Sequence, residues 1–252
     1  MKLSGVAAIV TGGGSGLGRA TAETLAAKGA QVVVFDLNSA AAEEAAKAIG
    51  GVAVVGDVAD EASAGAAIAK AAAAHGPARV LVNCAGIGTA KRVVGRDGPH
   101  PLADFEKVIR VNLIGTFNMI RLVSAAMAKL EPIDGERGVI VSTASVAAYD
   151  GQIGQAACSA SKGGVVAMTL PIARELAQIG VRVNGIAPGI FMTPMLFGLP
   201  QAAQDSLGAS VPFPPRLGQP AEYAALAAHI IENGYINGET IRIDGALRMA
   251  PR

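Results

Sequence analysis

Short runs of apolar residues alternate along this chain with longer amphipathic stretches. The short runs are rich in β-branched residues and predict strands at Val6–Val10, Gln31–Asp36, Val52–Gly56, Arg79–Asn83, Gly138–Ser142, Val181–Ala187 and Thr240–Ile243. The longer stretches are rich in alanine and predict helices near residues 16–28, 39–49, 61–75, 103–130, 155–178 and 220–232. Strands and helices therefore alternate over most of the sequence.

The predicted strands are apolar throughout, without the alternation of a sheet that has one face in water. Such runs suit strands that helices cover on both faces, as in a parallel sheet. Seven of them, joined by helical crossovers, predict an α/β Rossmann fold with a doubly wound, seven-stranded parallel sheet. We expect residues 1–252 to form one domain. A polar insertion at 87–101 and a proline-rich stretch at 188–219 interrupt the pattern, and the second is expected to be a substrate loop.

Composition narrows the possible partners and the compartment. A formal net charge of +1 gives no electrostatic case for nucleic acid or an anionic membrane surface. The apolar runs are too short to span a membrane, so no transmembrane segment is expected. The two cysteines are expected to be reduced thiols, which favours a cytoplasmic location, or an organelle matrix if a presequence precedes this sequence. The histidines lack metal-ligand spacing, so no metal site is expected.

A glycine-rich segment, Thr11-Gly12-Gly13-Gly14-Ser15-Gly16-Leu17-Gly18, lies between the first predicted strand and the first predicted helix. Glycines here let backbone N–H groups approach a pyrophosphate at the helix N-terminus. The motif alone is weak, but its place in a βαβ unit favours a dinucleotide site over an ordinary turn. Asp36 ends the second strand, where a carboxylate accepts hydrogen bonds from ribose hydroxyls and repels a 2′-phosphate. The sequence therefore favours NAD over NADP.

Ser145, Cys158 and Lys162 form a second pattern, because residues 158 and 162 share one helical face and Ser145 follows the fifth strand. With the spacing Gly12-x3-Gly16-x-Gly18, this pattern resembles the short-chain dehydrogenase/reductase family. The family has a serine, a tyrosine and a lysine at the three positions, so Cys158 stands in the place of the catalytic tyrosine. The resemblance covers nearly the whole chain and implies an NAD-dependent oxidoreductase that interconverts a secondary alcohol and a ketone.

The resemblance assigns roles to further residues. The resemblance implies that the catalytic residues are Ser145, Cys158, Lys162 and Asn112, and that Asn112 holds a water in a proton relay. It implies that Ser145 and Gln155 contact the substrate. The cofactor places fall to Gly12, Ser15, Gly16, Leu17, Gly18, Asp36, Asp57, Val58, Cys84, Gly86, Lys162, Pro188, Phe191 and Thr193. Without the resemblance, Asp57 would be interpreted as a helix cap, Asn112 as a surface residue and Cys84 as a small buried residue.

The thiol of Cys158 is acidic enough to replace the phenol of the tyrosine, but its side chain is too short to reach the same position. A thiol has a pKa near 8.5, and a neighbouring lysine would lower it. Its sulfur, however, ends roughly 3.5 Å short of a tyrosine oxygen, and a misplacement of about 1 Å can cost on the order of 10²-fold in rate. We expect a chain that binds NAD and substrate but turns over slowly. Tyr149 is the nearest other phenol in sequence, but it lies in a loop without a lysine at helical spacing.

Runs such as 151–157 and 244–249 resemble one subgroup, the type II 3-hydroxyacyl-CoA dehydrogenases, some of which act as 17β-hydroxysteroid dehydrogenases. This implies oxidation of 3-hydroxyacyl-CoA to 3-ketoacyl-CoA in fatty acid metabolism. It also implies a homotetramer formed through the two long helices near 103–130 and 155–178 and through the C-terminal region. Two alternatives stay open, a catalytically inactive dinucleotide-binding or scaffold protein and another short-chain alcohol or ketoester reductase. Binding of coenzyme A would distinguish a 3-hydroxyacyl-CoA dehydrogenase from another short-chain alcohol or ketoester reductase. Lys91, Arg92 and Arg96 are either phosphate contacts or a solvated basic loop.

Overall fold

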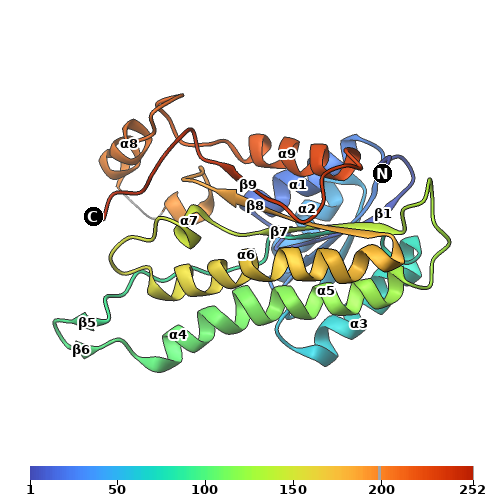
Figure 1. Cartoon of the computed structure of the whole chain (residues 1–252), viewed down its shortest axis with the longest axis horizontal. Helices are drawn as coiled ribbons and strands as arrows, with labels where there is room; N and C mark the ends of the chain where they lie inside the picture. Colours follow the sequence, from blue (N-terminus) through green and yellow to red (C-terminus); the bar gives the residue numbers. More distant parts are fainter. Residues whose placement is uncertain (198–199, 252) are drawn as a thin grey trace.

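A seven-stranded parallel sheet forms the centre of the computed structural model, which describes residues 1–197 and 200–251 (Figure 1). The strand order is β3-β2-β1-β4-β7-β8-β9. The strands are β1 (Ala7–Thr11), β2 (Gln31–Asp36), β3 (Val52–Val55), β4 (Val80–Asn83), β7 (Gly138–Thr143), β8 (Val181–Pro188) and β9 (Thr240–Ile243). The predicted fold is confirmed, and each predicted strand ends within a residue of the observed bounds.

Helices cover both faces of this sheet, which explains why its central strands are apolar on both sides. Along β1, Val10 packs in one core and Ile9 in the other, because successive side chains of a strand point to opposite faces. On one face lie α1 (Gly16–Ala27), α2 (Ser39–Ile49) and α9 (Pro220–Glu232). On the other lie α3 (Glu61–His75), α5 (Thr116–Met127) and α6 (Ala156–Leu176) (Figure 1). The order reverses between β1 and β4, and such a switch point opens a ligand crevice at the carboxyl ends of the strands.

The helix predicted at 103–130 differs from the expectation. It consists of α4 (Leu102–Ile109), a π-helical turn at Arg110–Gly115, and α5. Thr116, the first residue of α5, donates from its hydroxyl to the carbonyl of Asn112 in the turn at 2.7 Å. Such turns often occur at functional sites. Within the described residues, the span Leu102–Met127 is also long and apolar enough to cross a membrane, but half of its most apolar window is buried in the fold, as in the core helix of a folded domain.

The two irregular stretches contain short elements that the sequence pattern did not reveal. The insertion at 87–101 forms a small antiparallel hairpin of β5 (Val94–Gly95) and β6 (Gly98–Pro99). The proline-rich stretch contains α7 (Pro194–Phe197) and α8 (Gln201–Ala209), and its residues 198 and 199 lie outside the described residues. Both stretches lie at the end of the molecule where α6 begins (Figure 1). They therefore flank the carboxyl edge of the sheet.

Candidate active site

The glycine-rich segment connects β1 to α1 and leaves no room for side chains at two points. A Cβ atom on Gly12 would lie 2.8 Å from the Ala85 backbone, and one on Gly18 would lie 2.1 Å from the Gly12 carbonyl oxygen. Leu17 packs against the core. Ser15 is the exposed N-cap of α1, and its side chain makes no capping hydrogen bond. The Ser15 hydroxyl and the first N–H groups of α1 are therefore available to bind an anion.

Asp36 closes the end of β2 beside this segment. Its carboxylate accepts hydrogen bonds from the Gly14 N–H at 2.9 Å and the Asn38 N–H at 3.0 Å. A carboxylate has about four lone-pair sites, so two remain for the hydroxyls of a ligand. Arg19 on α1 is paired with Glu23 and Glu44. This end of the crevice therefore presents a fixed carboxylate, and the arginine of α1 is already engaged.

Asp57 and Val58 follow β3. The Asp57 carboxylate accepts a hydrogen bond from the Ala59 N–H at 2.8 Å. The N-cap of α3 is Asp60, whose side chain accepts from the Ser63 N–H, so the interpretation of Asp57 as the cap of this helix is wrong. The Val58 side chain is buried. A ligand at this position would therefore meet the Asp57 side chain and the Val58 backbone.

The Cys84 side chain points into the fold. Its Sγ lies 3.7 Å from the Tyr223 hydroxyl and 3.5 Å from the Thr143 hydroxyl, and those two hydroxyls are 2.7 Å apart. Burial raises the pKa of the Cys84 thiol. Cys84 is thus a packing residue with a protonated thiol, and a ligand along this part of the crevice would meet backbone atoms.

Asn112 is fully buried and bridges two elements, so its interpretation as a surface residue is wrong. Its amide accepts from the Ile87 N–H at 2.8 Å and donates to the Ile87 carbonyl at 2.9 Å and to the Ser161 hydroxyl at 3.2 Å. A Cβ on Gly86 would lie 3.2 Å from the Asn112 Oδ1 and 3.6 Å from the Lys162 Nζ. Asn112 therefore fixes the chain after β4 beside α6, and only glycine fits comfortably between the two side chains.

Lys162 and Ser145 meet the end of β7. The Lys162 ammonium donates to the Thr143 carbonyl at 2.7 Å. Its burial lowers the pKa of Lys162 from 10.5 to about 8. Ser145 opens the 3₁₀ turn Val146–Ala148, where its Oγ accepts from the Ala147 N–H at 3.1 Å. The serine O–H proton is thereby left for another acceptor, such as a substrate oxygen.

Cys158 lies one helical turn before Lys162 in α6. Its Sγ is directed at the Thr89 carbonyl, 3.9 Å away, on the insertion that follows β4. Among the described residues, no hydrogen bond connects this thiol to Lys162 or Ser145. The structure thus brings the three positions of the sequence pattern to one end of β7 and α6, but the sulfur is turned toward the insertion.

Gln155, the predicted substrate contact, is the residue before α6. Its side-chain carbonyl accepts a hydrogen bond from the Gln152 N–H at 3.0 Å, which closes a turn of the loop that precedes the helix. Its Nε2 still has donors for a ligand. Gln155 therefore shapes the loop next to Cys158.

Pro188, Phe191 and Thr193 follow one another where β8 leaves the sheet. Pro188 ends the strand and is buried. The buried Phe191 ring packs on Gly218, where a Cβ would lie 2.8 Å from the ring. The Thr193 side chain reaches the glycine-rich segment, 3.5 Å from where a Cβ of Gly16 would lie. The start of the 188–219 stretch thus crosses to the first helix over the crevice edge.

Arg242 connects Tyr149, Asp150 and Asp244 into a group that the sequence pattern did not predict. Its guanidinium forms ion pairs with Asp150 and Asp244 and lies 5.2 Å from the centre of the Tyr149 ring. The segment after Ser145 is thereby tied to β9. Burial raises the pKa of Tyr149, so this phenol is poorly suited to replace the missing catalytic tyrosine. Asp150 lies 92 residues before Arg242 in the sequence, so only the fold reveals the group.

These contacts fit a dinucleotide. Close-packed glycines expose backbone, Ser15 keeps an uncommitted side chain, and Asp36 is oriented beside them. A serine hydroxyl and a buried ammonium stand farther along the same carboxyl edge. A parallel sheet with these groups at its switch point defines the class of Rossmann-fold enzymes that bind a dinucleotide.

Comparison with known proteins identifies the family. The short chain dehydrogenase family matches residues 6–203. Human 3-hydroxyacyl-CoA dehydrogenase type-2 is 53% identical over 99% of this chain and 98% of its own length, and the Drosophila melanogaster protein of that name is 54% identical over 96% and 97%. The crystal structure of 3-hydroxyacyl-CoA dehydrogenase type-2 from Mycobacterium avium has a TM-score of 0.94 at 45% identity, covering 98% of each chain. The chain belongs to the short-chain dehydrogenase family.

Family membership confirms the resemblance inferred from the glycine-rich segment and the Ser145–Lys162 spacing. The chain is an oxidoreductase, and its cofactor is a nicotinamide dinucleotide.

Proposed function

We propose that this protein interconverts 3-hydroxyacyl-CoA and 3-ketoacyl-CoA with NAD, and that Cys158 makes it slow. The observation that carries the proposal is a family site complete but for one side chain, in a chain that matches proteins named 3-hydroxyacyl-CoA dehydrogenase type-2 over nearly its full length. Hydroxysteroids are a secondary substrate class in this proposal, because a secondary alcohol is the shared reacting group.

The preference for NAD over NADP rests on Asp36. Its carboxylate is held by two backbone N–H groups, so it stays in place to accept hydrogen bonds from ribose hydroxyls. A 2′-phosphate at the same place would meet a like charge. Arg19, the basic residue of α1 that could offset that charge, is held by Glu23 and Glu44. The nicotinamide ring of the bound cofactor supplies or takes up the hydride.

The protein's own part is to orient the substrate oxygen and manage its proton. The Ser145 hydroxyl has a free proton to donate to that oxygen. The pKa of the Lys162 ammonium is about 8, close to neutral pH, and its positive charge favours an anion beside it. The family's tyrosine would connect the two. The Cys158 side chain is too short to reach the substrate oxygen, and its sulfur faces Thr89. Proton transfer is therefore the step that this chain does poorly.

A second candidate function is binding of NAD(H) without catalysis, as a sensor or scaffold. The one observation that favours it is Cys158, because the change falls on the acid/base position and leaves the cofactor contacts intact. Intact Ser145 and Lys162 speak against it, since a protein that only binds the dinucleotide has no use for them.

The test combines binding and turnover. NADH binding is measured by calorimetry, because the chain has no tryptophan to report it. Consumption of NADH is then followed with acetoacetyl-CoA, an acetoacetyl ester and a steroid ketone. The proposal expects NADH binding and slow turnover that is fastest with acetoacetyl-CoA. Binding with no turnover of any substrate would favour the sensor, and faster turnover of the simple ester would favour another ketoester reductase.

We further propose that the protein is a homotetramer. Large apolar side chains are exposed on the π-helical turn, on α5 and on α6, among them Ile114, Phe117 and Leu170, which are 51%, 48% and 43% exposed. In Figure 1, α5 and α6 run alongside each other, and both pack on the same side of the sheet. Exposed apolar surface of this kind marks protein interfaces. Light scattering that gives the mass of one chain would contradict the proposal.

A further inference from the structure

Tyr223 is a buried tyrosine on α9, on the face of the sheet opposite the helix that carries Lys162. Among the described residues, it has the largest side chain that the fold buries completely. Phenylalanine would fill the same space without a polar atom, and a buried hydroxyl costs stability unless it is hydrogen-bonded. The partners of the Tyr223 hydroxyl therefore show what the residue holds in place.

The Tyr223 hydroxyl lies at the carboxyl ends of β4 and β7. It is 2.7 Å from the Thr143 hydroxyl, which lies 2.6 Å from the Asn83 carbonyl oxygen. A carbonyl only accepts, so Thr143 donates its one proton to Asn83, and the Tyr223 O–H donates to the Thr143 oxygen. The Cys84 sulfur, 3.7 Å from the Tyr223 oxygen, completes the row as a donor. Burial raises the pKa of both Cys84 and Tyr223, so both keep their protons.

This row of hydrogen bonds fixes Thr143 just beyond the last residue pair of β4 and β7. The next peptide group is fixed from the other side, because the Ala144 N–H donates to the Ile186 carbonyl on β8 at 2.7 Å. The Thr143 carbonyl between them accepts from the Lys162 ammonium at 2.7 Å, and within the described part of the chain it is the one acceptor bonded to that ammonium. The end of a flexible four-carbon side chain is thus placed by Thr143.

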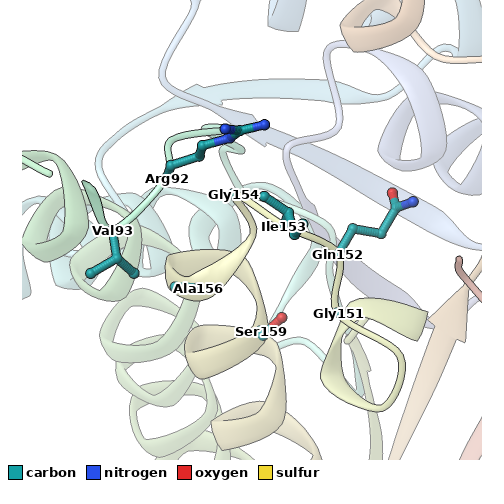
Figure 2. A pocket seen from close by; sticks show the side chains of 8 residues that line it. All are labelled: Arg92, Val93, Gly151, Gln152, Ile153, Gly154, Ala156 and Ser159. Atoms are coloured by element: carbon teal, nitrogen blue, oxygen red, sulfur yellow. The ribbon is translucent and has the colours of Figure 1, made fainter. Parts of the chain in front are cut away.

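Tyr223 has no direct access to the open side of the site. A pocket of about 480 Å³ opens beside the first turn of α6, between residues 92–93 and residues 151–159 (Figure 2). Tyr223 is not among the described residues that line it, and α9 covers the opposite face of the sheet. A change at Tyr223 therefore reaches the reacting groups through the residues that its hydroxyl contacts.

We infer that Tyr223 is a positioning residue for the reaction: its hydroxyl holds Thr143, and the Thr143 carbonyl holds the Lys162 ammonium. The inference rests on the proposed role of Lys162 in managing the substrate proton, and it names a residue on which that role depends. A hydroxyl that served only the core would affect stability and leave the Lys162 ammonium as it is. A hydroxyl that positions Thr143 also supports the hydrogen bond that favours the charged form of the lysine.

Tyr223→Phe tests the inference, because it keeps the ring and removes only the hydroxyl. The pKa of Lys162 is measured by NMR on protein labelled with carbon-13 at the lysine Cε atoms, and the Lys162 signal is the one missing from Lys162→Met. The titratable groups beside Lys162 are the thiols of Cys84 and Cys158, and both are kept in the labelled proteins.

Thr169→Val is the matched control. Thr169 is also buried on α6, but its hydroxyl donates along the helix, to the Val165 carbonyl at 2.8 Å. Weakening the hydrogen bond to the ammonium should lower the pKa of Lys162 by about 0.3–1 pH unit in Tyr223→Phe, and the control should leave it unchanged. In the Cys158→Tyr background, Tyr223→Phe should lower kcat for acetoacetyl-CoA by about three- to ten-fold, with KM unchanged because the change lies behind the sheet.

An equal Lys162 pKa in Tyr223→Phe and the unmodified chain would overturn the inference, as would equal changes in Tyr223→Phe and Thr169→Val. Thr143→Val should act like Tyr223→Phe, and combining the two should lower the pKa no further. An additional decrease would overturn the inference, because Tyr223 would then act by another path. If no variant turns over acetoacetyl-CoA, the proposed function fails, and the NMR comparison still decides whether Tyr223 positions Lys162.

Discussion

Replacing Cys158 by tyrosine should convert a slow enzyme into a fast one. Cys158 is partly exposed and faces the insertion at Thr89, so a ring can enter there without displacing the core. Lys162 stays one turn away, held to the Thr143 carbonyl at 2.7 Å. The new phenol would therefore arrive beside a positive charge, which lowers its pKa toward neutral pH.

The size of the gain follows from the geometry. The sulfur ends roughly 3.5 Å short of a phenol oxygen, well beyond the misplacement of about 1 Å that can cost 10²-fold. A positioned general acid contributes about 10²–10⁴-fold to rate. We therefore expect kcat for acetoacetyl-CoA reduction to rise by about 10²–10⁴-fold, with little change in the affinity for NADH, because the contacts of Asp36 and the glycine-rich segment are untouched.

Steady-state consumption of NADH measures this gain, and Cys158→Phe is the matched control. Phenylalanine supplies the same ring without the hydroxyl, so that variant should stay slow. A rate in the phenylalanine variant equal to that of the tyrosine variant would refute the reasoning, because the ring and not the proton would then matter. Equal rates in the unmodified chain and the tyrosine variant would refute it as well.

Three further predictions concern other parts of the molecule. Asp36→Ser should lower the preference for NAD over NADP by at least about tenfold, and an unchanged ratio of the two Kd values by calorimetry would rule out the ribose role of Asp36. Burial holds the pKa of Lys162 near 8 instead of 10.5, so the charged form of this lysine destabilises the fold. Lys162→Met should therefore raise the unfolding free energy at pH 7 by ~3 kcal/mol. In denaturant titrations the difference between the two proteins should shrink as the pH rises from 8 to 10.5, and a constant difference would contradict this prediction. Phe117→Glu should reduce the mass in light scattering, whereas Glu175→Gln, an exposed change elsewhere on the helices, should not.

The sequence predicted the elements whose signal is local. Continuous apolar runs marked the strands, and the segment 11–18 with Asp36 marked the cofactor crevice, because each depends on residues close together in the chain. The hairpin of β5 and β6 and the short helices of 188–219 were missed, because these elements have too few residues to show a hydrophobic period.

Features that depend on contacts between distant segments could not be predicted. Asn112 is buried because its amide bonds Ile87 and Ser161, and only the fold brings these together. The same is true of Arg242 with Asp150, and of the pocket between residues 92–93 and 151–159. Spacing placed Cys158 beside Lys162 on the helix, but the direction of its sulfur depends on where the insertion lies.

The most direct test of the account uses NADH that carries deuterium at the transferred position. The unmodified chain is incubated with this cofactor and acetoacetyl-CoA for long enough to tolerate a slow enzyme, and the thioester is analysed by mass spectrometry. We expect 3-hydroxybutyryl-CoA with one deuterium on the carbinol carbon, formed faster by the Cys158→Tyr variant. Unreacted acetoacetyl-CoA with both proteins, despite bound NADH, would contradict it.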